Sequence, residues 1–324
     1  MTIFSKFQPF FEDKPTKMSS NHLSHFPVMV NEAISFLKPE NEKTYLDCTF
    51  GQGGYSKMIL ENSKCNIIAI DRDQDSEIYA REMKDKFKSR FIFNIDRFSN
   101  IDLLMKKYKI KNMDGMILDL GVSNTQLNNP DRGFSFSKEG PLDMRMDNIS
   151  NKLTAEIIVN EYQENELSDI FFYYGEEKNS KRIAREIINY RKKKKIDSTK
   201  ILSEIIKKIS YDKFKHPATR VFQALRIFIN EELDELESIL ELSKTILNKE
   251  SRIVVVSFHS LEDRIVKNFF RKNKVKEKKL SQDSYSSNEF CFKIITKKPV
   301  TPSSNEIKLN PRSRSAKMRV AEKI

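Results

Sequence analysis

The stretch Tyr45-Leu46-Asp47-Cys48-Thr49-Phe50-Gly51-Gln52-Gly53-Gly54-Tyr55 decides the fold. An apolar lead-in ends at three glycines within four positions, and an amphipathic segment, residues 56–60, follows at once. This order predicts a strand, a tight glycine turn and a helix, which open a nucleotide-binding α/β unit. Because glycine has no Cβ, we expect the turn to let the backbone lie against a ligand.

The distribution of glycine supports this interpretation. The chain has 8 glycines in 324 residues, and all but Gly175 fall between positions 51 and 140. A chain that uses glycine so sparingly is expected to keep it where backbone geometry requires it. Residues 45–147 are therefore the predicted site of the chemistry.

Strands alternate with helices in the first part of the chain. Apolar runs at 66–70, 91–95 and 113–119 predict further strands buried on both faces, separated by helices at 74–87 and 100–108. Such alternation predicts a doubly wound parallel sheet. Residues 152–230 then predict several helices without a strand, followed by a helix at 231–247 and strands at 252–257, 290–295 and 316–321, with a helix at 261–271. The sheet is thus expected to be interrupted by a helical insertion and completed afterwards.

Composition limits the classes of function. The net charge is +12 and the isoelectric point is near 9.3, which favours a polyanionic partner, nucleic acid before an acidic membrane, over the alternative of a lysine-rich bias. Three cysteines without metal-ligand spacing argue for a reducing compartment and against a zinc site. No apolar run has the length of a membrane span, and the N-terminus does not have the pattern of a secretory signal.

Two cofactors compete for the glycine turn. A dinucleotide site needs a third glycine three residues after the second, and that position is Ser56. S-adenosylmethionine has no phosphate to hold, so it suits this turn better. Asp71, at the predicted end of the second strand, can bind the ribose hydroxyls of either cofactor. The alternative role for Asp71 or Asp119 is to cap a helix, and Phe98 either stacks on adenine or packs in the core.

A series of unusual motifs spans the chain from residue 25 to residue 322. They are His25-Phe26-Pro27-Val28, residues 47–54, Ala69-Ile70-Asp71-Arg72-Asp73, Asp119-Leu120-Gly121-Val122-Ser123, Arg132-Gly133-Phe134-Ser135-Phe136, residues 140–147, Tyr174-Gly175-Glu176-Glu177, His216-Pro217-Ala218-Thr219-Arg220, Ser257-Phe258-His259-Ser260-Leu261-Glu262-Asp263-Arg264 and residues 310–315. In this order they closely resemble the bacterial small-subunit ribosomal RNA cytosine-N4 methyltransferase family.

The resemblance implies an α/β, class I S-adenosylmethionine-dependent methyltransferase fold, Rossmann-like, with a mostly parallel sheet and an inserted all-helical domain. Residues 1–20 would be a flexible tail, residues 21–130 and 231–324 the methyltransferase domain, and residues 131–230 the RNA-recognition domain. The implied donor is S-adenosyl-L-methionine. The implied acceptor is a decoding-site (P-site) cytidine of 16S rRNA in the small ribosomal subunit. The resemblance further implies a cytoplasmic enzyme that binds no membrane and no metal. Whether it forms a homodimer is left open.

Carried over by motif, the cofactor contacts of the family fall on Gly53, Gly54, Tyr55, Asp71, Phe98, Asp119 and Gln126. Two residues depart from the family pattern. Tyr55 stands where histidine is usual, which matters little if the backbone makes the contact. Asn124 stands where serine or threonine is usual, close to the expected target pocket.

The N4 amine of cytosine is a poor nucleophile, because its lone pair is delocalised into the ring. The enzyme must hold N4 in line with the methyl group and accept a hydrogen bond from it. Candidate acceptors are the loop from Asp119 to Asn124, Asp143 and His259. The alternative for Asp143 is an ion pair with Arg145, and a lone histidine such as His259 is more often structural.

Basic residues of the insertion are the candidate RNA contacts. Arg182 and Arg185 lie in a basic stretch from 181 to 195, whose alternative role is a solvated surface. Lys215, His216 and Arg220 form a second cluster. Arg132 stands next to Phe134 and Phe136, which either stack on unpaired bases or pack in the core. Two further hypotheses stay open: a nicotinamide-dependent oxidoreductase, and a methyltransferase-fold RNA-binding or assembly protein without catalysis.

Overall fold

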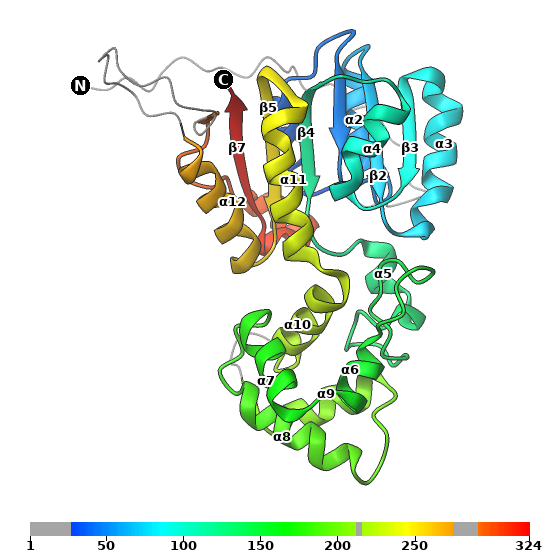
Figure 1. The fold of residues 1–324 in the computed structure, drawn as a ribbon, viewed down its shortest axis with the longest axis vertical. Coiled ribbons are helices and arrows are strands. Elements are labelled where there is room, and N and C mark those ends of the chain that lie inside the picture. Colours follow the sequence, from blue (N-terminus) through cyan, green and yellow to red (C-terminus); the bar gives the residue numbers. More distant parts are fainter. Residues whose placement is uncertain (1–26, 212–215, 275–290) are drawn as a thin grey trace, which may run out of the picture.

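The computed structural model describes residues 27–211, 216–274 and 291–324. Seven strands form one sheet in the order β3-β2-β1-β4-β5-β7-β6 (Figure 1). The first five are parallel, while β7 is antiparallel to both of its neighbours. The strands are β1 Thr44–Asp47, β2 Asn66–Asp71, β3 Phe91–Ile95, β4 Met113–Asp119, β5 Leu247–Ser257, β6 Phe292–Ile294 and β7 Lys317–Lys323.

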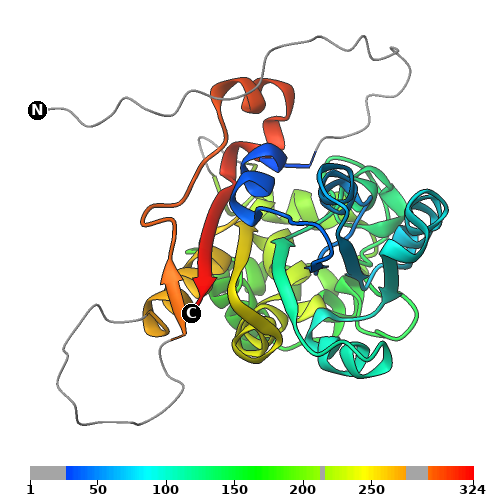
Figure 2. The same ribbon diagram turned by 90° about the horizontal axis from the view of Figure 1, so that it is seen from above.

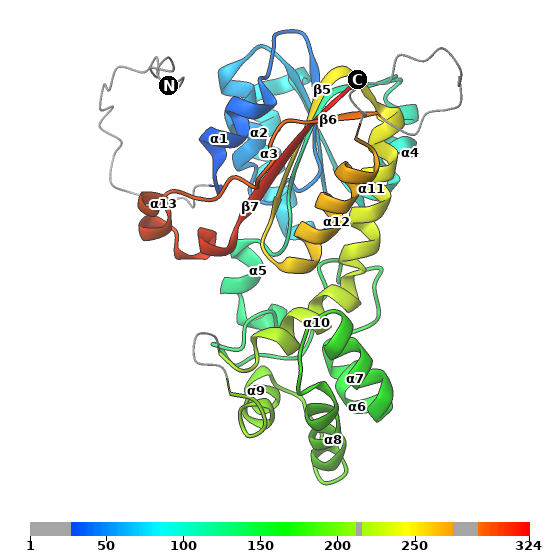
Figure 3. The ribbon, with the colours of Figure 1, turned by 90° about the vertical axis from the view of Figure 1, so that its left-hand side faces the viewer.

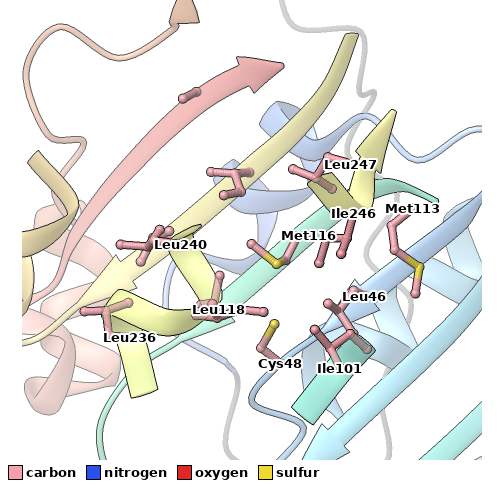
Figure 4. Packing of buried hydrophobic residues seen from close by; sticks show 14 of the residues in the cluster. Leu46, Cys48, Ile101, Met113, Met116, Leu118, Leu236, Leu240, Ile246 and Leu247 are labelled. Carbon is pink, nitrogen blue, oxygen red and sulfur yellow. The ribbon is translucent and has the colours of Figure 1, made fainter. Parts of the chain in front are cut away.

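Helices cover both faces of this sheet, as Figure 3 shows. One face carries α1 Val30–Leu37, α2 Gly54–Asn62 and α3 Glu77–Phe87, and the other carries α4 Ile101–Lys107, α11 Glu232–Ile246 and α12 Ser260–Lys272. Each face has its own apolar core. Figure 4 shows the second, where Leu236 and Leu240 of α11 pack on Met116 and Leu118 of β4. Each fully buried side chain of this size contributes about 1.5–3 kcal/mol to folding.

A second, helical lobe lies opposite the carboxyl ends of the parallel strands (Figure 1). It has an apolar core of its own, which runs from Phe134 to Ile229 along the chain. Its helices are α6 Ala155–Glu161, α7 Glu164–Tyr173, α8 Ser180–Arg191, α9 Thr199–Lys207 and α10 Thr219–Asn230. The chain enters the lobe through α5 Asn124–Asn128 and leaves it from α10 directly into α11.

The C-terminal region returns to the first part of the chain. Between β6 and β7 it forms α13 Ser304–Leu309, which lies beside α1 in Figure 2. Glu306 Oε1 accepts a hydrogen bond from Met29 N at 2.8 Å and so joins the two segments. Short 3-10 turns complete the structure: Gln74–Ser76, Lys88–Arg90, Phe98–Asn100, Pro130–Arg132 and Pro311–Ser315.

The predicted parallel sheet is confirmed, and the predicted strands agree with the observed ones to within a few residues. The largest difference is β5, which begins at Leu247 rather than at 252. Its early part pairs only through Met113 and Leu247, across an irregularity in the ladder. Its exposed Glu250 has a positive φ, a conformation that hydrophobic periodicity does not reveal. The predicted tail, residues 1–20, lies outside the described residues.

Candidate active site

The glycine turn after β1 is held by backbone geometry. Gly51 and Gly53 have φ values of 53° and 77°, in the left-handed region that favours glycine. A Cβ on Gly53 would lie 2.7 Å from the Phe50 ring, and one on Gly54 would lie 2.8 Å from Pro27. A Cβ on Gly51 would meet nothing within 4 Å. Internal packing therefore excludes a side chain at Gly53 and Gly54, whereas Gly51 borders open space, and the ligand contacts of the turn stay a prediction.

Asp71 closes this turn from the end of β2. Its Oδ2 accepts a hydrogen bond from Gly51 N at 2.6 Å, and its Oδ1 accepts one from Asp73 N at 2.9 Å. Burial raises the pKa of Asp71 to about 6, although both backbone N–H groups oppose the rise. A carboxylate oxygen has more than one acceptor site. Asp71 is thus fixed by the protein and can still accept hydrogen bonds from a diol.

Ser56, which disfavoured a dinucleotide, has a structural partner. Its Oγ donates to Asp47 Oδ2 at 2.6 Å, and both side chains are buried. Asp47 Oδ1 also accepts from Thr49 N at 3.1 Å. Burial raises the pKa of Asp47 to about 6. This pair fastens the first turn of α2 to the end of β1, where the glycine position of a dinucleotide fingerprint would stand.

Asp119, at the end of β4, has an oxygen without a partner. Its backbone N donates to Thr49 Oγ1 at 2.6 Å, which joins the ends of β4 and β1. Its Oδ1 is buried and has no hydrogen-bond partner among the described residues. Burial, together with the charges of Asp47 and Glu262, raises the pKa of Asp119 well above its usual range. A buried acceptor of this kind is complementary to a cationic ligand.

The remaining predicted cofactor residues differ in what they present. The Tyr55 side chain is buried and its hydroxyl donates to Val28 O, so only its backbone is near the turn. Gln126 is buried, and its Nε2 donates to Asp73 Oδ2 at 2.6 Å. Phe98 is partly exposed and packs against the core of the α11 face. A ligand contact of Phe98 or Gln126 stays a prediction.

Both predicted catalytic side chains have partners within the protein. Asp143 accepts from Arg145 Nε and Nη2 at 2.8 and 2.6 Å, which is the ion pair considered as its alternative role. His259 caps α12 in a reciprocal box with Glu262. Its Nε2 is buried, lies 3.0 Å from Glu262 Oε1 and is not aligned for a hydrogen bond. Both residues thus have the structural contacts considered as their alternatives, and their catalytic roles stay predictions.

The loop after β4 is the third predicted acceptor element, and it is held at several points. Ser123 and Gln126 form a capping box at the start of α5. Gln52 Nε2, from the glycine turn, donates to Thr125 Oγ1 at 2.9 Å. Asn124, the residue that departs from the family pattern, accepts from Arg312 of the C-terminal segment. The sequence did not suggest this contact between Asn124 and Arg312.

Arg132 is buried and paired within the protein. Its side chain is 8 % exposed, and its Nη1 and Nη2 lie 3.1 and 2.9 Å from the two carboxylate oxygens of Asp73. Nη2 also donates to the carbonyls of Arg145 and Met146 at 3.0 Å each. Arg132 therefore joins the helical lobe to the segment after β2, which favours a structural role, and its RNA contact stays an untested prediction.

The other basic candidates lie on the surface of the helical lobe. Arg182 and Arg185 are exposed on α8, and Arg185 Nε lies 3.4 Å from Glu164. The His216 ring stacks on Phe136 with centroids 4.3 Å apart. His216 and Arg220 line a cavity of about 140 Å³. Lys215 lies outside the described residues.

A buried charged cluster between the lobes was missed by the sequence analysis. Arg226 of α10 donates through Nε and Nη2 to the two oxygens of Glu232, each at 2.8 Å. Glu262 lies nearby and its pKa is lowered by His259 and Arg226, against its burial. Glu232, His259 and Glu262 bring potential metal-ligand atoms within 4.8 Å of one another. A cation there would compete with Arg226 for Glu232, so we propose no metal site.

The sheet has a single antiparallel strand, which lies next to β5, and the candidate ligand residues lie at the carboxyl ends of β1, β2 and β4. This arrangement defines the class I methyltransferase fold. Enzymes of this class use S-adenosyl-L-methionine. Among the described residues, no helix combines the length and apolarity needed to cross a membrane.

Comparison with known proteins identifies the family. A sequence model of the MraW methylase family matches residues 22–324, so the chain belongs to this family. Ribosomal RNA small subunit methyltransferase H from Rickettsia bellii is 49% identical over 308 residues, which cover 93% of this chain and 99% of the relative. The protein of the same name from Rickettsia prowazekii is 47% identical, covering 93% and 98%. A solved rRNA methylase from Streptococcus thermophilus aligns with 91% of this chain and 93% of its own at 9% identity, with a TM-score of 0.40.

Proposed function

We propose that this protein transfers a methyl group from S-adenosyl-L-methionine to the N4 amine of a decoding-site (P-site) cytidine of 16S rRNA in the small ribosomal subunit. The observation that carries the proposal is the match to relatives named for small-subunit rRNA methylation over 93% of the chain. A ribosomal substrate also implies a cytoplasmic protein.

The residues at the sheet edge fit the proposed cofactor. When bound, the cofactor supplies an activated methyl group on a cationic sulfonium. Asp71, fixed by two backbone N–H groups, would accept hydrogen bonds from the ribose hydroxyls. Asp119 would offer its unpaired Oδ1 to a positively charged group of the cofactor. Gly51, whose N–H bonds Asp71, borders open space in which a ligand could lie.

The acceptor half of the site is proposed at the loop after β4. A cytosine must be unstacked before its N4 can reach this edge of the sheet, at a cost of a few kcal/mol. The fixed loop from Asp119 to Ser123 lies between the sheet and the helical lobe. The exposed arginines of α8 would bind phosphates of the surrounding RNA and offset that cost. The helical lobe is thus the proposed RNA-recognition domain.

The test is transfer of labelled methyl from the cofactor to isolated small subunits that lack the modification. We expect incorporation into 16S rRNA, and none into subunits that already carry the mark. If the protein binds the cofactor but leaves unmodified subunits unlabelled, the substrate assignment is wrong. Full function of Asp71→Ala without cofactor binding would favour an assembly protein without catalysis.

A further inference from the structure

Arg226 lies beside the loop that follows β4, although it belongs to the helical lobe. A Cβ on Gly121 would lie 4.0 Å from Arg226 Nη1 and 3.8 Å from the ring of Phe258. Gly121 has a φ of 100° and is partly exposed, as is Phe258. The guanidinium and the aromatic ring therefore flank the backbone two residues beyond Asp119.

The guanidinium has one nitrogen to offer. Nε and Nη2 are both occupied by Glu232, whereas Nη1 has no partner among the described residues. The side chain of Arg226 is 14 % exposed, and Glu232 fixes the plane of its guanidinium. Nη1 is therefore a donor with a fixed direction on a partly exposed side chain.

The charges around Arg226 favour a neutral acceptor over a phosphate. The positive charge of Arg226 is accompanied by two carboxylates, those of Glu232 and Glu262. These carboxylates disfavour a phosphate at Nη1, whereas a carbonyl oxygen needs only the N–H dipole. The ring of Phe258 next to it suits the flat face of a base.

We infer that Arg226 Nη1 donates a hydrogen bond to the O2 carbonyl of the target cytosine and so orients its N4 amine. This role rests on the proposed function and adds a base contact supplied by the helical lobe. Glu232 fixes the direction of the guanidinium. The helical lobe would then orient the base through Arg226, while the sheet would hold the cofactor.

The decisive experiment pairs a change in the protein with a change in the base. Small subunits are reconstituted with semisynthetic 16S rRNA that carries either cytidine or 2-thiocytidine at the target, since sulfur is a weaker acceptor than oxygen. Methyl transfer is measured with the wild-type protein and with Arg226→Lys. We expect 2-thiocytidine to lower kcat/KM of the wild type roughly tenfold and that of the variant less than twofold. Equal losses in both proteins would overturn the inference.

Three controls separate this role from others. Arg264→Lys changes another arginine between the lobes, which bonds Glu176 at 2.5 Å, and should keep kcat within threefold. Cofactor affinity of Arg226→Lys should match the wild type, and rates are compared below the unfolding midpoint of the variant because lysine cannot reproduce the bidentate pair with Glu232. Arg226→Gln serves as a second variant. A fall in RNA affinity with a shallower salt dependence would indicate a phosphate contact and contradict the inference. If the wild type fails to methylate the cytidine subunits, the proposed function fails instead.

Discussion

Replacing Arg132 by methionine separates a structural role from an RNA-binding one. The substitution keeps an unbranched apolar stem and removes the guanidinium that pairs with Asp73, where both side chains are 8 % exposed. Removing one partner of a buried ion pair costs about 3–5 kcal/mol. Gln126 Nε2 and Asp75 N still donate to Asp73, at 2.6 and 3.0 Å. We therefore expect the free energy of unfolding to fall by about 3 kcal/mol, the lower end of this range.

Urea unfolding and thermal melting measure this loss. Because the chain has two lobes, the transition is followed by two probes to test whether it is cooperative. A loss of about 3 kcal/mol should lower the melting temperature by on the order of 10 °C. The matched control is Arg182→Met on the exposed face of α8, which should weaken RNA binding and leave stability unchanged. An Arg132→Met protein of unchanged stability and reduced RNA affinity would refute the reasoning.

Three further predictions follow from the site. Gly53→Ala should destabilise the protein more than Gly51→Ala, because only the Cβ at position 53 would meet Phe50. The two variants are compared by their unfolding midpoints, and equal midpoints would show that backbone strain alone decides the effect. Cofactor affinity should fall about tenfold from pH 7 to pH 5, because Asp71, with a pKa of about 6, loses its charge as the pH falls. Calorimetry across this range measures the affinity, and a constant value would contradict the role of Asp71. Reversing Arg182 and Arg185 to glutamate should lower RNA affinity and flatten its salt dependence, while cofactor affinity stays unchanged. Filter binding over a salt series measures the slope, and an unchanged slope would show that the two arginines do not contact RNA.

The sheet could be predicted because its signals are local. Unbroken apolar runs such as residues 66–70 and 113–119 belong to strands buried on both faces, and the left-handed turn at Gly51 and Gly53 needs glycine. The amphipathic pattern of residues 231–247 likewise gave α11 to within one residue at each end. These features depend on neighbours in sequence.

The partners of charged side chains could not be predicted in the same way. Arg132 meets Asp73 from 59 residues away, and its flanking phenylalanines suggested an exposed nucleic-acid contact instead. Arg226 stands in the middle of a helix whose pattern is dominated by apolar residues, so the sequence pattern does not mark it as a functional residue. For Asp143 and His259 the sequence left a catalytic and a structural role open, and it could not show that Arg145 and Glu262 lie against them. Long-range contacts decide such roles, and hydrophobic periodicity does not encode them.

The most direct test of the account is nucleoside analysis of 16S rRNA. Unmodified small subunits are incubated with the protein and S-adenosyl-L-methionine, and the digested rRNA is separated by liquid chromatography and mass spectrometry against synthetic standards. The account predicts N4-methylcytidine at a single decoding-site position, dependent on Asp71 and Asp119. Methyl on C5 or on the ribose, or no modified cytidine although cofactor is bound, would contradict it.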